Sequence, residues 1–337
     1  MVGDESSSPR SIPEAPVVVV TGDPGSGKTT LLTHWFDELI GQGQRAVWFG
    51  EEADGTDQLL PGLDQLISEA AEPLTIFLDE VGELRSPQTR RQLVQLIERG
   101  NGGHRFVVAQ QQTVRLPVAR LRTAQLVVEI DDAALSLDRD DLDRIIDERG
   151  LVLSERLRSE LLARTEGWAG GIVTVIDDLG SARQESAEDV VTRSLAELSG
   201  RMVEMIESAL GDGEFDLLVD TSVVERLEPG LCREVVGRDG PLDIERLSNS
   251  APFVAAPGGD VLRLHGLARQ GLLSRLVARE GAGEIAGRHR SAADWLEANG
   301  RLDCAIDHCL QVAQPERAAD ILAAKWSADD SAVGHDD

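Results

Sequence analysis

The sequence predicts an α/β fold: a parallel sheet with flanking helices in residues 15–133, then helical and winged-helix modules and the start of a helical-repeat array. Two observations lead to this prediction. Short β-branched and apolar runs alternate with amphipathic helical patterns as far as Asp131. Beyond Asp131, strand-like runs become rare and helical patterns dominate.

The first part is expected to contain five strands and three helices. Val17–Thr21 is a continuous apolar run, which is typical of a strand buried on both faces of a parallel sheet. Ser86 and Pro87 form a good capping pair for the third helix, whereas Pro61 is expected to break the second. The expected strands cover 17–21, 45–50, 74–80, 105–111 and 125–130, and the expected helices 28–43, 56–72 and 86–100.

The remainder is predicted to be mainly helical. One hairpin is expected at 253–265, with Gly258 and Gly259 in its turn, and a hairpin among helices indicates a winged helix. Three short amphipathic helices with alanines at packing positions follow it. The predicted segments are a disordered lead (1–14), an α/β domain (15–133), a helical bundle (134–200), a winged-helix-like domain (201–283), helical hairpins that begin a repeat (284–326) and a loose tail (327–337).

Composition restricts the class of protein. The formal net charge of −27 disfavours nucleic-acid binding by this chain itself. The polar N-terminus lacks the apolar core of a secretion signal, and no apolar run approaches the roughly 20 residues that span a bilayer. The 3 cysteines do not form a disulfide framework, so a reducing cytoplasm is expected. Nearly all basic residues are arginines, and the exceptions are Lys28 and Lys325.

The most specific motif is the glycine-rich stretch Gly22–Thr29, which fits G-x-x-x-x-G-K-[ST]. Glycines allow backbone N–H groups to face inward, and the start of the following helix adds its positive dipole end. Lys28 is expected to bridge the β- and γ-phosphates, and Thr29 to offer its hydroxyl to Mg²⁺. The predicted phosphate-binding residues are Gly22, Asp23, Pro24, Gly25, Ser26, Gly27, Lys28, Thr29 and Thr30.

Polar residues at two other strand ends complete the predicted site. Asp79 follows the apolar run 74–78, and we expect it to hold Mg²⁺ through water. Glu80 is the candidate base that orients the attacking water, with Lys28 assisting catalysis. Gln111 lies at the end of the fourth strand, where an amide can contact the γ-phosphate, although an ordinary polar strand end is the simpler interpretation.

At this point the sequence resembles a family, the large MalT/LuxR-type regulators of the STAND class of signalling ATPases. The resemblance covers roughly residues 16–326, and its segments occur in the family order. They read GDPGSGKTTLLTHWFDEL, AVWFGEEADGTD, LTIFLDE, LPVARLR, TEGWAGGI, RLHGLARQGLLSRL and HRSAADWLEANGRLDCAIDHCL.

The resemblance implies a nucleotide switch. It implies an ADP-bound resting form, an ATP-bound form that self-associates, and slow hydrolysis that resets the cycle, with ATP or ADP and Mg²⁺ as cofactors. It also implies that the segment around Trp168 packs near the base and that His265 senses the β-phosphate, although a histidine after a strand is more often structural. Inducer and DNA are expected to act through domains that this chain does not contain.

The sequence departs from the family pattern in three places. Gln111 replaces the arginine that usually ends the fourth strand, which puts γ-phosphate sensing and hydrolysis in doubt. The Pro-Arg motif that usually helps to enclose the base is not found before Val17, and no C-terminal helix-turn-helix is expected.

Three functions therefore remain open from the sequence. The preferred one is the ATPase core of a LuxR/MalT-type regulator. The alternatives are an AAA-like ATPase that remodels a partner, and a nucleotide-binding scaffold with a degenerate site. A metal site at Cys304 and His308, with His289 nearby, is disfavoured because the segment has no second paired motif.

Overall fold

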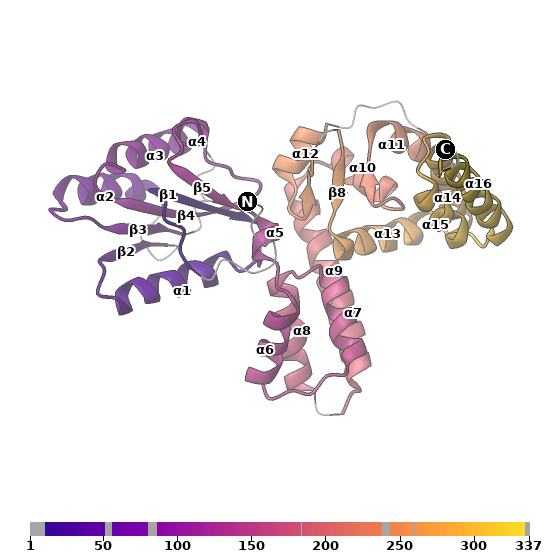
Figure 1. Cartoon of the computed structure of the whole chain (residues 1–337), viewed down its shortest axis with the longest axis horizontal. Coiled ribbons are helices and arrows are strands. Elements are labelled where there is room, and N and C mark those ends of the chain that lie inside the picture. Colours follow the sequence, from indigo (N-terminus) through magenta and orange to yellow (C-terminus); the bar gives the residue numbers. More distant parts are fainter. Residues whose placement is uncertain are drawn as a thin grey trace. The chain divides into compact units, whose positions relative to one another are not determined.

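The computed structural model describes residues 11–50, 56–79, 86–182, 184–237, 243–258 and 260–333. The chain divides into two compact units, Met1–Leu195 and Ala196–Asp337, which are described separately below (Figure 1). Among the described residues, no helix combines the length and the apolar character needed to cross a bilayer.

The first unit is built on a five-stranded parallel sheet with the order β2-β3-β4-β1-β5. Its strands are β1 (Val17–Gly22), β2 (Ala46–Phe49), β3 (Thr75–Leu78), β4 (Arg105–Gln111) and β5 (Val127–Ile130). The helices between them are α1 (Lys28–Gly41), α2 (Thr56–Glu69), α3 (Pro87–Gly100) and α4 (Ala119–Thr123). The α/β fold class and the parallel sheet predicted from the sequence are confirmed.

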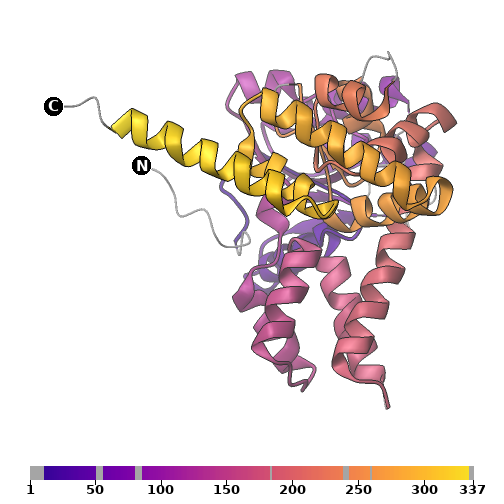
Figure 2. The ribbon, with the colours of Figure 1, turned by 90° about the vertical axis from the view of Figure 1, so that its right-hand side faces the viewer.

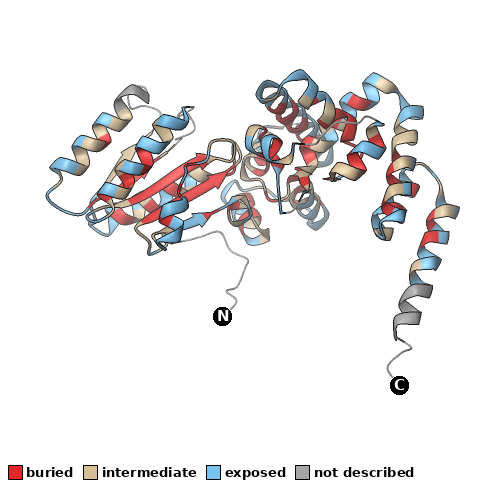
Figure 3. Cartoon of the chain, turned by 90° about the horizontal axis from the view of Figure 1, so that it is seen from above, coloured by how far each residue is buried: buried red, intermediate tan, exposed pale blue. Residues whose placement is uncertain are grey.

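Both faces of the sheet are covered, which explains the continuous apolar run in β1. Val17 and Val19 pack with α2 and α3 on one face, whereas Val18 and Val20 pack with α1 on the other. All four valines are fully buried, and the sheet forms the buried layer that Figure 3 shows between exposed helical surfaces. Because β1, β3 and β4 run parallel, their carboxyl ends lie at the same edge of the sheet.

One expectation about the helices is wrong. Pro61 does not break the second helix, because α2 continues from Thr56 to Glu69 with Pro61 inside it. Proline removes one backbone donor from a helix. Beyond it, Leu63 is fully buried against the sheet core, and this packing stabilises the helix despite the missing hydrogen bond.

A helical segment follows the sheet. Its helices are α5 (Asp132–Leu135), α6 (Arg139–Glu148), α7 (Glu155–Thr165), α8 (Ala169–Ser181) and α9 (Ala187–Ala209). Asp131, Asp138 and Ser154 accept backbone N–H groups at the starts of α5, α6 and α7. The long helix α9 runs without interruption past residue 200.

The second unit contains a small antiparallel sheet with the order β6-β8-β7, formed by Arg226–Leu227, Leu262–Leu264 and Val254–Ala255. This confirms the predicted hairpin and adds one strand to it; Gly259 lies outside the described residues. The helices around this sheet are α10 (Asp212–Thr221), α11 (Pro229–Val236), α12 (Ile244–Ser250) and α13 (Gly266–Glu280). Three further helices, α14 (Ala282–Ala298), α15 (Leu302–Gln311) and α16 (Pro315–Val333), pack one against the next (Figure 2).

Candidate phosphate-binding site

The glycine-rich loop joins the buried end of β1 to the start of α1. Gly25 and Gly27 have φ values of 74° and 92°, in the left-handed region that side chains other than glycine's rarely adopt. Gly27 precedes α1, and among the described residues no side chain caps this helix and no acidic residue lies in its first turn. The first amides of a 14-residue helix thus open onto the loop with their positive dipole end.

Lys28 folds back over this loop. Its Nζ atom donates to the carbonyl oxygens of Gly22 and Asp23, at 3.0 and 2.8 Å, and lies 3.5 Å from Ser26 Oγ. The carbonyls are neutral acceptors, and the Asp132 carboxylate lies near enough to interact with the ammonium charge. The structure therefore brings together Gly22, Asp23, Ser26 and Lys28, as the motif predicts.

The sequence analysis missed one residue of this site, Asp132. Both of its carboxylate oxygens accept the backbone N–H of Asp23, at 3.0 and 3.1 Å. Burial raises the pKa of the Asp132 carboxyl, against the opposing effects of the Asp23 N–H, Lys28 and the Ser26 hydroxyl. Asp132 lies 109 residues from Asp23 and looks like an ordinary acid in the first turn of a helix, so no local signal marked it.

The turn before α8 packs directly against the loop. Trp168 Nε1 donates to the carbonyl oxygen of Pro24 at 3.0 Å, and Gly170 N donates to that of Gly25 at 2.8 Å. A Cβ atom on Gly25 would lie 3.2 Å from the Trp168 ring, so the close approach also requires glycine at this position. The segment that the resemblance associates with the base thus contacts the glycine-rich loop itself.

The other predicted residues are located at the same edge of the sheet or outside the described part. Asp79 directly follows β3, and its backbone N–H donates to Phe49 O at 2.8 Å. Gln111 ends β4 and is paired in register with Gly22, next to the loop. Thr29 and Thr30 are exposed in the first turn of α1. Glu80 lies outside the described residues.

Gln110, which precedes Gln111, and His265 both have structural contacts. The neighbouring Gln110 is buried, and its amide bridges Thr21 Oγ1 and Leu116 N, each at 2.8 Å. His265 precedes α13, where its Nδ1 atom accepts the N–H of Leu267 at 3.2 Å. His265 belongs to the second unit, and the β-phosphate role that the resemblance implies for it stays a prediction.

Comparison with known proteins agrees with this architecture. Residues 203–284 match the family model of the MalT winged helix domain. In this segment the chain is similar to MalT-type regulators. The resemblance predicted from the sequence is confirmed, as is the winged-helix module of the fold class.

Curated relatives of this chain are much longer than it is. The serine/threonine-protein kinase PknK of Mycobacterium tuberculosis is 26% identical over 91% of this chain and 31% of its own length. The HTH-type transcriptional regulator MalT of Vibrio cholerae is 26% identical over 57% of this chain and 22% of its own length. The chain thus spans less than a third of the curated relatives that it matches.

Among solved structures, the Walker-type ATPase of Pyrococcus abyssi aligns with a TM-score of 0.55 at 14% identity, over 77% of this chain and 91% of that one. At this identity the likeness concerns the fold alone, and it agrees with a parallel sheet flanked by helices.

Proposed function

We propose that this MalT-like chain is a nucleotide-controlled switch, the ATPase core of a LuxR/MalT-type regulator. It binds ATP with Mg²⁺ at the loop Gly22–Thr29, hydrolyses it slowly, and self-associates in the ATP-bound form. The winged-helix match and the MalT relative support the regulatory part of this proposal.

The observation that carries the proposal is the geometry of the loop. Left-handed glycines, the amides that begin α1 and the Lys28 ammonium converge on one small volume. Such a cradle suits the closely spaced negative charges of a polyphosphate. On binding, Lys28 exchanges its neutral carbonyl acceptors for charged phosphate oxygens, which form stronger hydrogen bonds.

The chemistry of the donors also fits Mg²⁺. Hydroxyl and carboxylate oxygens are the protein ligands that this ion prefers, and Thr29 at the start of α1 and Asp79 directly after β3 would supply them. When bound, Mg²⁺ would neutralise charge on the β- and γ-phosphates. Gln111, paired with Gly22 in the sheet, is uncharged where the family pattern has arginine, and this favours slow hydrolysis over fast turnover.

The test compares two lysine variants. Lys28→Ala removes the ammonium from the loop, whereas Lys325→Ala removes the other lysine of the chain, whose ammonium pairs with Asp303 in the second unit. ATP and ADP affinities are measured by calorimetry, and assembly by size-exclusion chromatography with light scattering in the apo, ADP and non-hydrolysable ATP forms. We expect Lys28→Ala to lose ATP affinity by about a hundredfold and to remain small in all forms, and Lys325→Ala to behave as wild type.

The outcomes separate the three functions. Enlargement of the wild type with the triphosphate alone supports the switch. Turnover in the range of about 1–100 s⁻¹ that a partner stimulates would support a remodelling ATPase. Binding with the same oligomeric state in ADP and ATP, and no hydrolysis, would support a scaffold. A folded wild type that takes up no ATP would refute the nucleotide site itself.

A further inference from the structure

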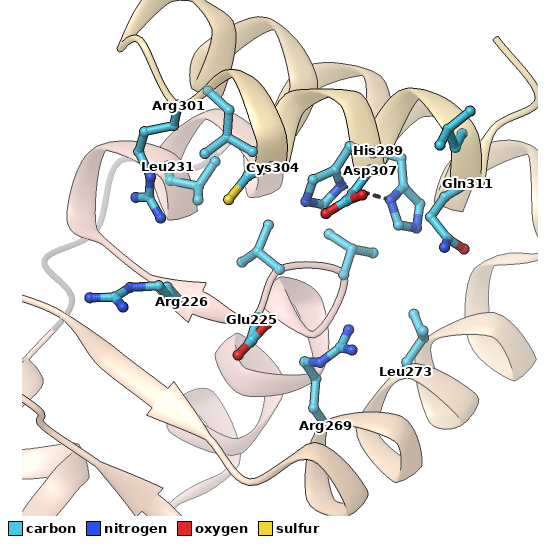
Figure 4. A pocket seen from close by; sticks show the side chains of 15 residues that line it. Glu225, Arg226, Leu231, Arg269, Leu273, His289, Arg301, Cys304, Asp307 and Gln311 are labelled. Carbon is cyan, nitrogen blue, oxygen red and sulfur yellow. Dashed lines mark hydrogen bonds between the residues drawn. The ribbon is translucent and has the colours of Figure 1, made fainter. Parts of the chain in front are cut away.

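The second unit contains a cavity of about 430 Å³ between its winged-helix part and the helices α14 and α15 (Figure 4). Its floor is apolar and buried, and its polar side chains come from α13, α14, α15 and the turn before β6. The buried apolar residues of the lining are Val223, Val224, Leu231 and Leu296. This volume falls within the range of small-molecule sites.

Arg269 projects from α13 into this cavity (Figure 4). Its Nε atom is buried and has no hydrogen-bond partner among the described residues. The guanidinium makes one long hydrogen bond, from Nη1 to Ser222 O at 3.4 Å. A buried donor without an acceptor lowers the stability of a folded protein by about 1–3 kcal/mol. An acceptor that enters the cavity and binds Arg269 would therefore be favoured.

Two histidines lie on the opposite wall. His289 on α14 and His308 on α15 share a hydrogen bond between their Nδ1 atoms at 2.8 Å, drawn as a dashed line in Figure 4. Burial, the neighbouring His289 and Arg269 lower the pKa of His308 to about 4, and burial and Arg269 also lower that of His289. Both rings are therefore neutral at pH 7 and add no positive charge beside Arg269.

The charges at the rim are largely paired elsewhere. Glu225 forms an ion pair with Arg263, and Arg301 forms one with Glu228. Asp307 and Arg226 are exposed at the rim and carry opposite charges. Inside the rim, Arg269 is the cation that lacks a charged partner among the described lining residues.

We propose that this cavity binds a small organic carboxylate, whose anionic group pairs with Arg269 while its apolar body packs on the valine and leucine floor. A guanidinium matches a carboxylate with two parallel hydrogen bonds, and one unbalanced cation favours a monoanion. The paired imidazoles offer a further donor to the same anion. Among the described residues, no group of three or more His, Cys, Asp or Glu side chains is placed to hold a metal ion.

Benzoate is a suitable probe, because it combines a carboxylate with an apolar ring. Benzamide is its uncharged counterpart, and acetate lacks the ring. Binding to the whole chain is followed through the imidazole C–H signals of His289 and His308 in NMR spectra. We expect benzoate to shift these signals with the highest affinity, acetate to bind more weakly and benzamide not to bind.

Three variants test the role of the charges. Arg269→Gln should weaken benzoate binding by at least about tenfold. Arg275→Gln, which removes an exposed arginine of α13 that pairs with Glu207, should leave it unchanged. Asp307→Asn removes the negative charge at the exposed rim and should strengthen binding by a fewfold, a gain that a damaged fold would not produce.

The pH dependence gives an independent measurement. A bound carboxylate favours protonated imidazole, so the affinity for benzoate should increase as the pH falls from 7 to 5. The other titratable or charged groups in the lining of the cavity are Arg226, Glu225, Arg269, Arg301, Cys304 and Asp307. No shift of the two histidine signals at millimolar benzoate would overturn the proposal. The proposal would also be overturned if Arg269→Gln bound benzoate as tightly as the wild type does, or if the wild type bound benzamide as tightly as benzoate.

Discussion

At the scale of single residues, the phosphate loop contains opposite charges in a small space. Asp132 holds the N–H of Asp23, and Lys28 is bound to carbonyls of the same loop. The glycines and Lys28 could be predicted, because the motif that specifies them is contiguous in the sequence. Asp132 could not, because only the folding of β5 beside β1 brings it to the loop.

The negative charge of Asp132 should oppose phosphate binding. Asp132→Asn keeps an acceptor for the Asp23 N–H and removes the charge, so we expect ATP affinity to increase by about three- to tenfold. Asp131→Asn is the matched control, because Asp131 is the exposed neighbour that caps α5 through Ala134 N. Calorimetry measures the affinities, and a weaker affinity in Asp132→Asn would contradict this role.

The same variant also has a defined pH dependence of stability. The pKa of the Asp132 carboxyl is raised in the folded protein, so its ionised form costs stability at neutral pH. Asp132→Asn should therefore melt at or above the wild-type temperature at pH 7. The difference should shrink as the pH falls through the raised pKa, because the wild-type carboxyl then takes up its proton.

Gly22 should not tolerate a side chain. A Cβ atom there would lie 2.5 Å from Asp132 Oδ1 and 2.5 Å from Ser26 Oγ, so the loop must shift. We expect Gly22→Ala to lower the free energy of unfolding by about 1–3 kcal/mol in urea titrations. In Gly41→Ala, at the end of α1, the new Cβ meets no described atom within 4 Å, and stability should stay equal or rise. Equal stabilities for Gly22→Ala and wild type would contradict this.

At the scale of elements, α8 is coupled to the phosphate loop through the turn that precedes it. Glu166 and Gly167 both adopt positive φ values of 52° and 77°, and this turn directs Trp168 onto Pro24 and Gly25. The sequence predicted a helical bundle over 134–200, which includes the helices on both sides of this turn. It did not predict this contact, since periodicity specifies faces and ends but not long-range partners. Pro61 illustrates the same limit, because burial of Leu63 outweighs a local helix-breaking signal.

Trp168 should report on nucleotide binding. Trp168→Phe keeps a ring against Gly25 but removes the hydrogen bond to Pro24 O, and we expect a loss of about 0.5–1.5 kcal/mol in the free energy of unfolding. Nucleotide should change the tryptophan fluorescence of the wild type and much less that of Trp168→Phe. Trp326→Phe, which replaces a largely exposed tryptophan on α16, should retain the wild-type response. An unchanged response in Trp168→Phe would rule out Trp168 as the reporter.

At the scale of the whole molecule, the sheet with its helical segment and the winged-helix part with α14–α16 form separate compact units. The α/β class was predictable because alternating strands and helices, with buried strand patterns, allow few architectures. The cavity in the second unit was not predictable. Its histidines lie 19 residues apart on two helices, and only their packing brings the two Nδ1 atoms together.

The two units should respond differently to nucleotide. ATP with Mg²⁺ at about a hundred times its dissociation constant should stabilise the unit that binds it by roughly 2.7 kcal/mol. We therefore expect calorimetric melting to show one transition that shifts upward and one that stays in place. Lys28→Ala should lose the shift. A single transition that moves as a whole would contradict independent unfolding of the units.

The lysine content of the chain has a practical consequence. Apart from the N-terminal amine, amine-directed reagents can attack Lys28 and Lys325 alone. Lys325 forms its ion pair with Asp303 near the surface, whereas Lys28 is tied to two carbonyls of the loop. Acylation kinetics followed by peptide mass spectrometry would therefore give two readings from one molecule: the state of the loop from one amine, and an internal reference from the other.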